Sequence, residues 1–417
     1  MNRTHRRTAA VVLTLALPLS AAASAGAQAT AQATARATPP SATATAAPAP
    51  APTPTVLQIP RPTGPFAVGR DIRHLVDQKR RDPWIPKAGA RELMVSMYYP
   101  ARAGGPGARA PYLTTEEARL LLEGRRLDGA VAVEQVTGTL TNARAGARPV
   151  GGTHPLVVLS PGFSLTRGTL TTLSEELASR GYVVALLDHA HESFGTSFPG
   201  GRTLTCTACD IVEAAPSDEA SRKRLARAAT DRAADISFVV DELTGRPAAG
   251  EPAFWKHAAM IDPKRVGAAG HSLGGNASAH AMAVDPRIRA GVNMDGTFFR
   301  PVPAAGLGGR PFLMLGTLDG HAPAGEDTTW PTAWQRLDGW KRWLTVRDSG
   351  HFTFTDLPVL AGQLGMTDPS APLPGDRSGA ITTAYVGAFF DQALRSVHQP
   401  LLDGPSAADP EVTFQNP

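Results

Sequence analysis

The 417-residue sequence contains few cysteines, no long apolar run after its first thirty residues and no basic cluster interleaved with aromatic residues. Because no later segment has 18 consecutive apolar residues, we expect no membrane-spanning helix. The absence of a basic and aromatic patch argues against nucleic acid as a partner. No internal repeat is present, which argues against a repeat architecture.

Cysteine occurs only twice, as Cys206 and Cys209 in "TLTCTACDIV". Two thiolates without suitably spaced histidines make a poor zinc site. A thioredoxin-type redox pair needs a strand before the motif and a helix starting at it, and that context is not evident. We therefore favour a small-loop structural disulfide over a redox or metal role.

The N-terminal region predicts an exported protein. Residues 1–27 place Arg3, Arg6 and Arg7 before an apolar run at 9–19 and end in small residues, which is typical of a secretory signal peptide. Its removal would lower the formal net charge from +4 to +1. Residues 28–56 are Ala/Thr/Pro-rich and are predicted to be a disordered spacer, so that residues 57–417 form the catalytic domain.

From residue 57 onward, apolar runs alternate with helical patterns. Near-continuous apolar runs are typical of parallel strands that are covered on both faces, and they occur at 92–100, 154–160, 182–188, 265–270, 289–295, 310–316 and 342–348. Helical patterns occur at 169–181, 221–245, 275–283 and 381–397. This alternation predicts an α/β fold with one mostly parallel, doubly wound sheet and helices on both faces.

Residues 111–136 interrupt the alternation. The segment starts with a capping-box pattern, Thr114 followed by Glu117, and contains a leucine cluster. It predicts either a small cap over a site or a helix packed on the sheet edge.

The stretch "VGAAGHSLGGNASA" at 266–279 contains the one G-x-S-x-G pattern of the sequence. Such a pentapeptide arises by chance fairly often, but here a predicted strand precedes Ser272 and an Ala-rich helix follows it. That context predicts a sharp strand-to-helix turn that holds a nucleophilic serine clear of the backbone, with glycines at the crowded positions.

A serine nucleophile requires an imidazole base and a carboxylate that orients it. His351 follows the last predicted strand and is favoured over His398 and over His321, which we interpret as an ordinary loop histidine. Between the serine and His351, Asp295 ends one predicted strand and Asp319 follows the next, and both satisfy the order Ser, Asp, His.

Backbone N–H groups of Leu273 and Phe163 are predicted to form an oxyanion hole, because Leu273 follows the serine and Phe163 follows an earlier strand. The alternative is that Pro161-Gly162 is only a turn. The cluster Asp188, His189, His191 and Glu192 has no recognised metal-ligand spacing, and we expect it to line the pocket mouth.

The motifs "RELMVSMYYPA", "VVLSPGF", "GHSLGG", "NMDGTFF" and "DSGHFTF" together resemble the secreted bacterial α/β-hydrolases related to platelet-activating factor acetylhydrolase. The resemblance implies the α/β-hydrolase fold, calcium-independent hydrolysis of short or oxidised sn-2 acyl esters, and Asp295 rather than Asp319 as the acid. We expect no cofactor and no metal. Residues 111–136, which would shape the acyl pocket, match the family least.

We therefore expect a secreted serine esterase, extracellular or periplasmic, with Ser272, His351 and Asp295 as its catalytic residues. Its expected partner is a small-molecule or lipid ester, met in solution or at a lipid or polymer surface. The alternatives are a polyester or cutin-type hydrolase and a non-catalytic binding module with the same fold. The sequence gives neither the oligomeric state nor the acyl length.

Overall fold

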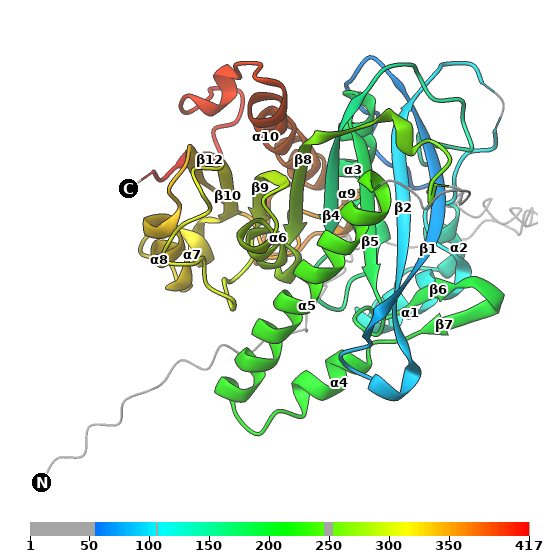
Figure 1. The fold of residues 1–417 in the computed structure, drawn as a ribbon, viewed down its shortest axis with the longest axis horizontal. Coiled ribbons are helices and arrows are strands. Elements are labelled where there is room, and N and C mark those ends of the chain that lie inside the picture. The colour runs from blue at the N-terminus through cyan, green and yellow to red at the C-terminus, as the bar shows by residue number, and fades with distance from the viewer. Residues whose placement is uncertain (1–54, 106, 246–252, 417) are drawn as a thin grey trace, which may run out of the picture.

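A ten-stranded sheet forms the centre of the computed structural model, which describes residues 55–105, 107–245 and 253–416. In chain order its strands are β1 (Ala67–Arg81), β2 (Ala90–Ala101), β3 (Arg144–Ala145), β4 (His154–Ser160), β5 (Val183–His189), β8 (Ile261–His271), β9 (Ile288–Met294), β10 (Phe312–Thr317), β11 (Lys341–Val346) and β12 (Val412–Phe414). Across the sheet the order is β12-β11-β10-β9-β8-β4-β5-β2-β1-β3 (Figure 1). The strands from β11 to β5 run parallel. Strand β12 is antiparallel to β11, β2 is antiparallel to β5 and β1, and the short β3 runs parallel to β1.

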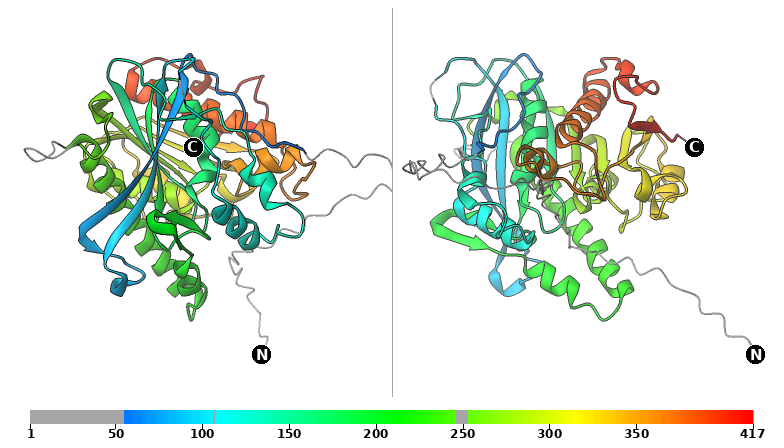
Figure 2. Two further views of the ribbon diagram at one scale, coloured as in Figure 1. Left: turned by 90° about the vertical axis from the view of Figure 1, so that its right-hand side faces the viewer. Right: turned by 180° about the vertical axis from the view of Figure 1, so that it is seen from behind.

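Helices cover both faces of the sheet. Helices α5 (Asp218–Thr244) and α6 (Leu273–Val284) lie in front in Figure 1, while α3 (Thr171–Ser179) and α10 (Gly375–Arg395) cover the other face, seen from behind in Figure 2. Successive residues of β4 point to opposite faces, so Leu156 and Val158 join one core and Val157 and Leu159 join the other. Each such buried side chain contributes about 1.5–3 kcal/mol to stability, which explains why this strand is apolar throughout.

The seven strands and four helices expected from the sequence are confirmed, with ends that shift by a few residues. Strand β1 was not expected. Charged residues occupy much of its length, because it lies near the sheet edge and pairs with β2 on one side and only briefly with β3 on the other. The expected signal peptide and residues 28–54 of the expected spacer lie outside the described residues.

Residues 111–136 form a cap. Helix α1 (Thr115–Gly124) starts with the expected capping box of Thr114 and Glu117, and α2 (Val133–Thr137) follows it. Both helices pack against α9 (Asp356–Gln363) in an apolar cluster that is separate from the two sheet cores. Of the two alternatives for residues 111–136, the structure therefore agrees with the cap and not with a helix packed on the sheet edge.

The remaining elements are short. They are the hairpin β6 (Thr196–Phe198) and β7 (Arg202–Leu204), the helices α4 (Thr207–Glu213), α7 (Leu318–His321) and α8 (Thr329–Arg336), and 3-10 turns at Pro86–Ala88, Arg167–Leu170, Pro199–Gly201, Ala258–Met260 and Pro400–Leu402. Cys206 and Cys209 form a disulfide, as expected. The motif nevertheless follows a strand, β7, and starts a helix, α4, a context that was not evident from the sequence. Across the described ranges, each helix is too short or too polar to span a bilayer.

Candidate active site

Three of the predicted residues lie at one edge of the sheet. Ser272 directly follows β8, Asp295 directly follows β9, and His351 lies in the loop after β11. Because β8, β9 and β11 belong to the parallel part of the sheet, their carboxyl ends meet on the same side, where α/β proteins place their sites.

Ser272 occupies a strained turn between β8 and α6. Its backbone has φ 55° and ψ −124°, a conformation that L-residues rarely adopt, and its N–H donates to the Met294 carbonyl at 2.7 Å. A Cβ on Gly270 would lie 2.3 Å from the Gly274 carbonyl carbon, and a Cβ on Gly274 would lie 2.1 Å from the Ser160 carbonyl oxygen. Only glycine fits these two positions, and the tight turn that results presents the serine side chain at the sheet edge.

Ser272, His351 and Asp295 form one hydrogen-bonded row. His351 Nε2 lies 2.9 Å from Ser272 Oγ, and His351 Nδ1 lies 2.6 Å from Asp295 Oδ2. The tautomer that donates Nδ1–H to the carboxylate leaves Nε2 as an acceptor for the serine hydroxyl. The His351 side chain is 44% exposed, so substrate can reach this end of the row.

The Asp295 carboxylate is buried and is held from two sides. Its Oδ1 accepts the Thr317 N–H at 2.7 Å and lies 2.8 Å from His321 Nδ1, while Oδ2 faces His351. Burial opposes ionisation, but positive His321 and hydrogen bonds from both histidines outweigh it and hold the pKa of Asp295 well below its usual range. Asp319, the alternative acid, is exposed and takes no part in the row.

The interpretation of His321 as an ordinary loop histidine is wrong. It is 7% exposed, and its Nε2 lies 3.4 Å from Asp327 Oδ2 while its Nδ1 faces Asp295. Burial lowers its pKa, but the two carboxylates dominate and raise it to about 9. His321 is therefore an imidazolium at neutral pH, and Asp295 lies between two histidines. The sequence offered only a weak signal for this role. His321 follows β10 at the sheet edge that carries the site, but so does Asp319, which takes no part in the row.

His271 precedes the serine and contacts the main chain of His351. Its Nε2 lies 2.6 Å from the His351 carbonyl oxygen, and the two rings are 4.8 Å apart. Burial, together with the neighbouring His351, lowers the pKa of His271 to about 3. A neutral imidazole that donates Nε2–H to this carbonyl holds the His351 loop in place.

The two predicted oxyanion donors lie on adjoining segments. Leu273 is the first residue of α6, and Phe163 lies in the loop after β4 that packs against the glycines of the turn. Both side chains belong to one small apolar cluster. Neither N–H donates to an acceptor within the described residues, so both remain available to a ligand oxygen.

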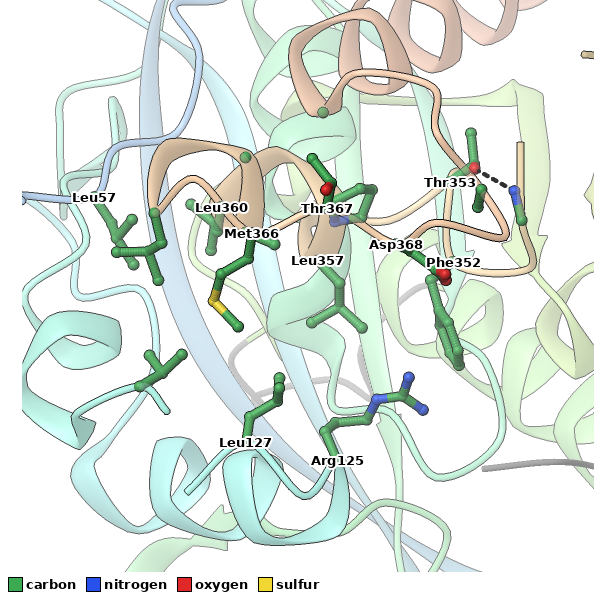
Figure 3. A pocket seen from close by; sticks show the side chains of 18 of the residues that line it. Leu57, Arg125, Leu127, Phe352, Thr353, Leu357, Leu360, Met366, Thr367 and Asp368 are labelled. Carbon is green, nitrogen blue, oxygen red and sulfur yellow. Dashed lines mark hydrogen bonds between the residues drawn. The ribbon is translucent and has the colours of Figure 1, made fainter. Parts of the chain in front are cut away.

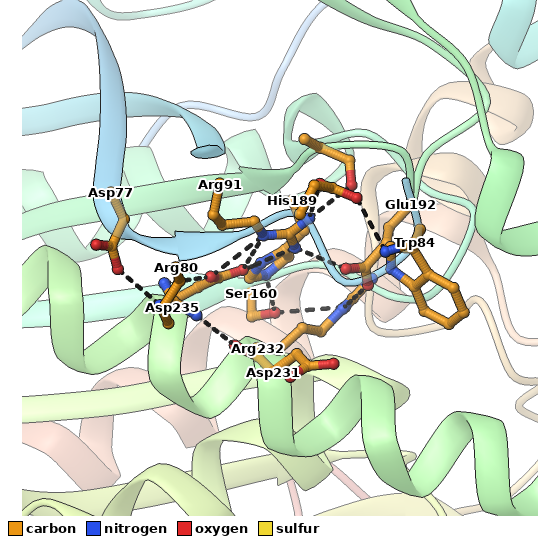
Figure 4. Close-up of polar contacts among 12 residues, drawn as sticks. Asp77, Arg80, Trp84, Arg91, Ser160, His189, Glu192, Asp231, Arg232 and Asp235 are labelled. Carbon is orange, nitrogen blue, oxygen red and sulfur yellow. Dashed lines mark hydrogen bonds and ion pairs between the residues drawn. The ribbon is translucent and has the colours of Figure 1, made fainter. Parts of the chain in front are cut away.

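Beneath this loop lies a buried ionic cluster, shown in Figure 4. Arg91 of β2 donates to Glu192 at 2.7 Å and to Asp235 of α5 at 2.8 Å, and Arg232 of α5 donates to the other Glu192 oxygen at 2.7 Å. All four side chains are at most 1% exposed. The expectation that Asp188, His189, His191 and Glu192 line the pocket mouth is therefore wrong. Asp188, His189 and Glu192 are at most 2% exposed and have buried partners, and none of the four residues lines the cavity described below.

The same cluster contains a second row of serine, histidine and aspartate. Ser160 Oγ lies 2.9 Å from His189 Nε2, and His189 Nδ1 lies 2.7 Å from Asp235 Oδ2. Burial lowers the pKa of His189, with nearby Arg232 adding to the effect. Arg232 also donates to the Pro161 carbonyl at 2.6 Å, which ties the cluster to the loop that carries the predicted oxyanion donor.

An apolar cavity of about 170 Å³ adjoins the exposed row, and His351 is among its lining residues. Figure 3 shows this cavity with Phe352 on its wall. The cap supplies one wall and α9 with its flanking loops supplies the opposite wall, including Leu121, Leu122, Val131, Leu357, Leu360 and Met366. Residues 111–136 therefore shape the pocket beside the site, as the resemblance implied.

Within the described residues, no group of three or more His, Cys, Asp or Glu side chains has the arrangement of a metal site. Asp356, which is close to His351 in sequence, does not join the row. Its carboxylate instead accepts the N–H groups of Thr171 and Thr172 and the Tyr112 hydroxyl, fastening α9 to α3 and the cap.

Sequence comparisons identify several similar proteins. Residues 53–201 match the family described as platelet-activating factor acetylhydrolase, isoform II. A probable 1-alkyl-2-acetylglycerophosphocholine esterase of Arthroderma benhamiae is 29% identical over 85% of this chain and 93% of its own. A platelet-activating factor acetylhydrolase of Cavia porcellus is 21% identical over 51% of each chain.

The solved structure of a ferulic acid esterase from Streptomyces cinnamoneus is 41% identical to this chain and superposes with a TM-score of 0.72. The match covers 86% of this chain and 99% of that one. The similar proteins are thus named either as esterases or as acetylhydrolases.

Proposed function

Because the chain belongs to the platelet-activating factor acetylhydrolase-like α/β-hydrolases and is a carboxylic ester hydrolase, we propose that it cleaves short-chain acyl esters, including sn-2 acyl groups of phospholipids. The observation that carries the proposal is the hydrogen-bonded row of Ser272, His351 and Asp295 at the open edge of the sheet. The alternative of a non-catalytic module predicts a broken row, so the intact row argues against it.

In the proposed mechanism, His351 Nε2 takes the hydroxyl proton as Ser272 Oγ attacks the ester carbonyl. The N–H groups of Leu273 and Phe163 stabilise the negative oxygen that develops in the tetrahedral intermediate. Protonated His351 then donates its proton to the leaving alcohol, which yields an acyl-enzyme on Ser272. Water, deprotonated by the same histidine, releases the acid.

Asp295 orients His351 and stabilises it once it is protonated. A carboxylate can do so only while ionised, and the neighbouring His321 favours that ionised form. In this proposal, His321 is a positioning residue that acts on the base through the shared carboxylate.

Hydrolysis of p-nitrophenyl acetate tests the proposal. We expect Ser272→Ala to abolish turnover above the uncatalysed background while the circular dichroism spectrum and melting temperature stay close to those of the unchanged protein. Ser278→Ala, which alters a serine of α6 outside the row, is the matched control. A folded Ser272→Ala protein with wild-type turnover would refute the assignment.

A second candidate substrate class is aromatic esters such as feruloyl esters. It is favoured by the similarity to the ferulic acid esterase and by the partly exposed aromatic side chains of Trp84, Phe163 and Phe299, which pack beside Leu273. A panel of methyl ferulate, a phospholipid with an sn-2 acetyl group, acyl esters from acetyl to palmitoyl and a polyester film separates these classes by kcat/KM and by release of acid.

We also propose that the protein is exported, with residues 1–27 as the signal peptide. The basic and apolar pattern of these residues supports export, and so does the Cys206–Cys209 disulfide, because disulfides persist in oxidising compartments. N-terminal sequencing of the exported protein tests it: a start close to residue 28 is expected, whereas retention of residues 1–27 would contradict the proposal.

A further inference from the structure

Arg125, the residue that ends helix α1 of the cap, differs from every other deeply buried arginine that the structure describes. Five arginines are at most 7% exposed: Arg70, Arg91, Arg125, Arg167 and Arg232. Three of them pair with buried carboxylates, namely Arg91, Arg167 and Arg232. Arg70 donates to the Pro111 carbonyl and the Ser96 hydroxyl.

The Arg125 guanidinium has no such acceptor. In the described residues, no carboxylate, carbonyl or hydroxyl accepts a hydrogen bond from it, and its Nη1 is sealed from solvent without a partner. It packs on the Phe352 ring, whose centroid lies 3.8 Å from the guanidinium carbon. Asp368 lines the same cavity, but its carboxylate accepts the N–H and hydroxyl of Ser370.

This unpaired charge lines the same cavity as His351. Arg125 lines the apolar cavity next to the exposed row, and Figure 3 shows its side chain directed toward Phe352. Phe352 follows the proposed base, and the rings of His351 and Phe352 are 5.3 Å apart. The positive charge is also close enough to contribute to the lowered pKa of His271.

Burying a guanidinium without an anion or acceptor is unfavourable, and a cation–π contact offsets only part of that cost. A ligand oxyanion would supply the missing partner and would gain a charge-assisted, bidentate contact in a site of low polarity. We infer that Arg125 is an anion subsite and that the enzyme prefers esters bearing a carboxylate or phosphate near the scissile bond, with their apolar part in the cavity.

The inference rests on the proposed function, because it concerns which esters reach Ser272. Its test therefore compares matched esters on one enzyme. The acyl-side pair is 4-nitrophenyl glutarate, with a free carboxylate, and its neutral methyl ester. The alcohol-side set is 4-acetoxybenzoate, its neutral methyl ester and 4-acetoxyphenyl phosphate, so that carboxylate and phosphate are separated.

The readout is the ratio of kcat/KM for the anionic ester to that for its neutral counterpart. We expect Arg125→Gln to lower this ratio by about ten- to a hundredfold in at least one set, which is the size of the effect of losing a charge-assisted hydrogen bond. The ratio for Arg125→Lys should lie between those of the wild-type and Arg125→Gln proteins. Any general loss of activity or folding cancels in the ratio. Arg119→Gln is the charge-matched control, because Arg119 lies on the same helix and pairs with Glu116 and Glu123 away from the cavity.

Equal ratios for the wild-type and Arg125→Gln proteins in both sets would overturn the inference and would mean that Arg125 only packs on Phe352. Neutral esters keep this outcome separate from a failure of the proposed function. If the wild-type protein hydrolyses none of them, the esterase assignment itself fails. Loss of the preference with Arg119→Gln as well would also overturn the inference, because it would trace the effect to net charge.

Discussion

The protein contains two rows of serine, histidine and aspartate that share their hydrogen-bond lengths and differ in almost everything else. Ser272, His351 and Asp295 are linked at 2.9 and 2.6 Å, and Ser160, His189 and Asp235 at 2.9 and 2.7 Å. We call the first of these the outer row. Its serine lies on a strained turn, and its imidazole is accessible to solvent. The second, the inner row, is at most 2% exposed, and its serine lies in a regular strand.

The comparison shows that two serines with the same hydrogen-bond geometry can differ in the other features that a nucleophile requires. The N–H groups of Leu273 and Phe163 near the outer serine have no acceptor among the described residues, whereas the inner hydroxyl faces a buried histidine and the cation of Arg232. The inner row instead supports the outer one, because it lies at the base of the loop that carries Phe163 and is fastened there through Arg232. Substitutions in the two rows distinguish the proposed catalysis of the outer row from the proposed support by the inner row.

Removing the charge of the outer carboxylate should have the largest effect. Asp295→Asn is expected to lower kcat about 10⁴-fold, because the amide stabilises the wrong tautomer of His351 and cannot stabilise its protonated form. Asp319→Asn should leave kcat within about twofold of wild type. Steady-state hydrolysis of p-nitrophenyl acetate measures both, and the reverse pattern would move the acid to Asp319.

Breaking the buried ion pairs of the inner cluster should act first on stability. Arg232→Met leaves Glu192 with an unpaired buried oxygen and is expected to reduce the free energy of unfolding by about 3–5 kcal/mol. It should also lower kcat in the protein that remains folded, since the Pro161 carbonyl loses its donor.

Urea unfolding and kinetics at a temperature where the variant is folded test both effects. Arg227→Met, on the same helix but largely exposed, is the control and should change stability little. Unchanged stability in Arg232→Met would show that the ionic cluster is not a support.

The pH dependence of stability should reveal His321. Its folded-state pKa of about 9 lies above the ordinary value of 6.5, so protonation stabilises the folded protein. This contribution, about 3 kcal/mol, is complete below pH 6.5 and is lost as the pH rises through 9.

We expect the fall in stability between pH 6.5 and 9 to be smaller in His321→Gln than in wild type. His398→Gln, which alters an exposed histidine outside the site, should keep the wild-type fall. Identical pH curves for wild type and His321→Gln would contradict the paired imidazolium described here.

Removing the inner serine hydroxyl should have the smallest effect. Ser160→Ala deletes one neutral hydrogen bond to His189 and is expected to cost about 1–2 kcal/mol of stability with kcat within about threefold of wild type. Thermal unfolding and hydrolysis rates measure the two quantities. A folded Ser160→Ala protein that had lost activity a thousandfold would assign chemistry to the inner row.

Much of the fold could be predicted because its central strands are buried on both faces. The apolar runs that became β4, β5 and β8 reflect that burial directly. Strand β1 could not be found in the same way, since edge strands keep charged residues. The cap was recognisable from its capping box, although only the structure placed it over the cavity.

The proximity of Ser272, Asp295 and His351 could be predicted from strand ends, because parallel strands bring their carboxyl ends together. Their catalytic roles remain predictions. The contact of His321 with Asp295 and the inner cluster could not be predicted, because Arg91, Glu192 and Asp235 are far apart in sequence and charged residues usually indicate surface. Likewise, nothing in the sequence distinguishes Arg125 from an exposed arginine.

The most direct test of the account is covalent labelling with a fluorophosphonate ester, which reacts with activated serines, followed by peptide mass spectrometry. We expect one adduct per chain, on the peptide that contains Ser272, with activity lost in proportion to labelling. An adduct on Ser160 instead, or full loss of activity with Ser272 unmodified, would contradict it.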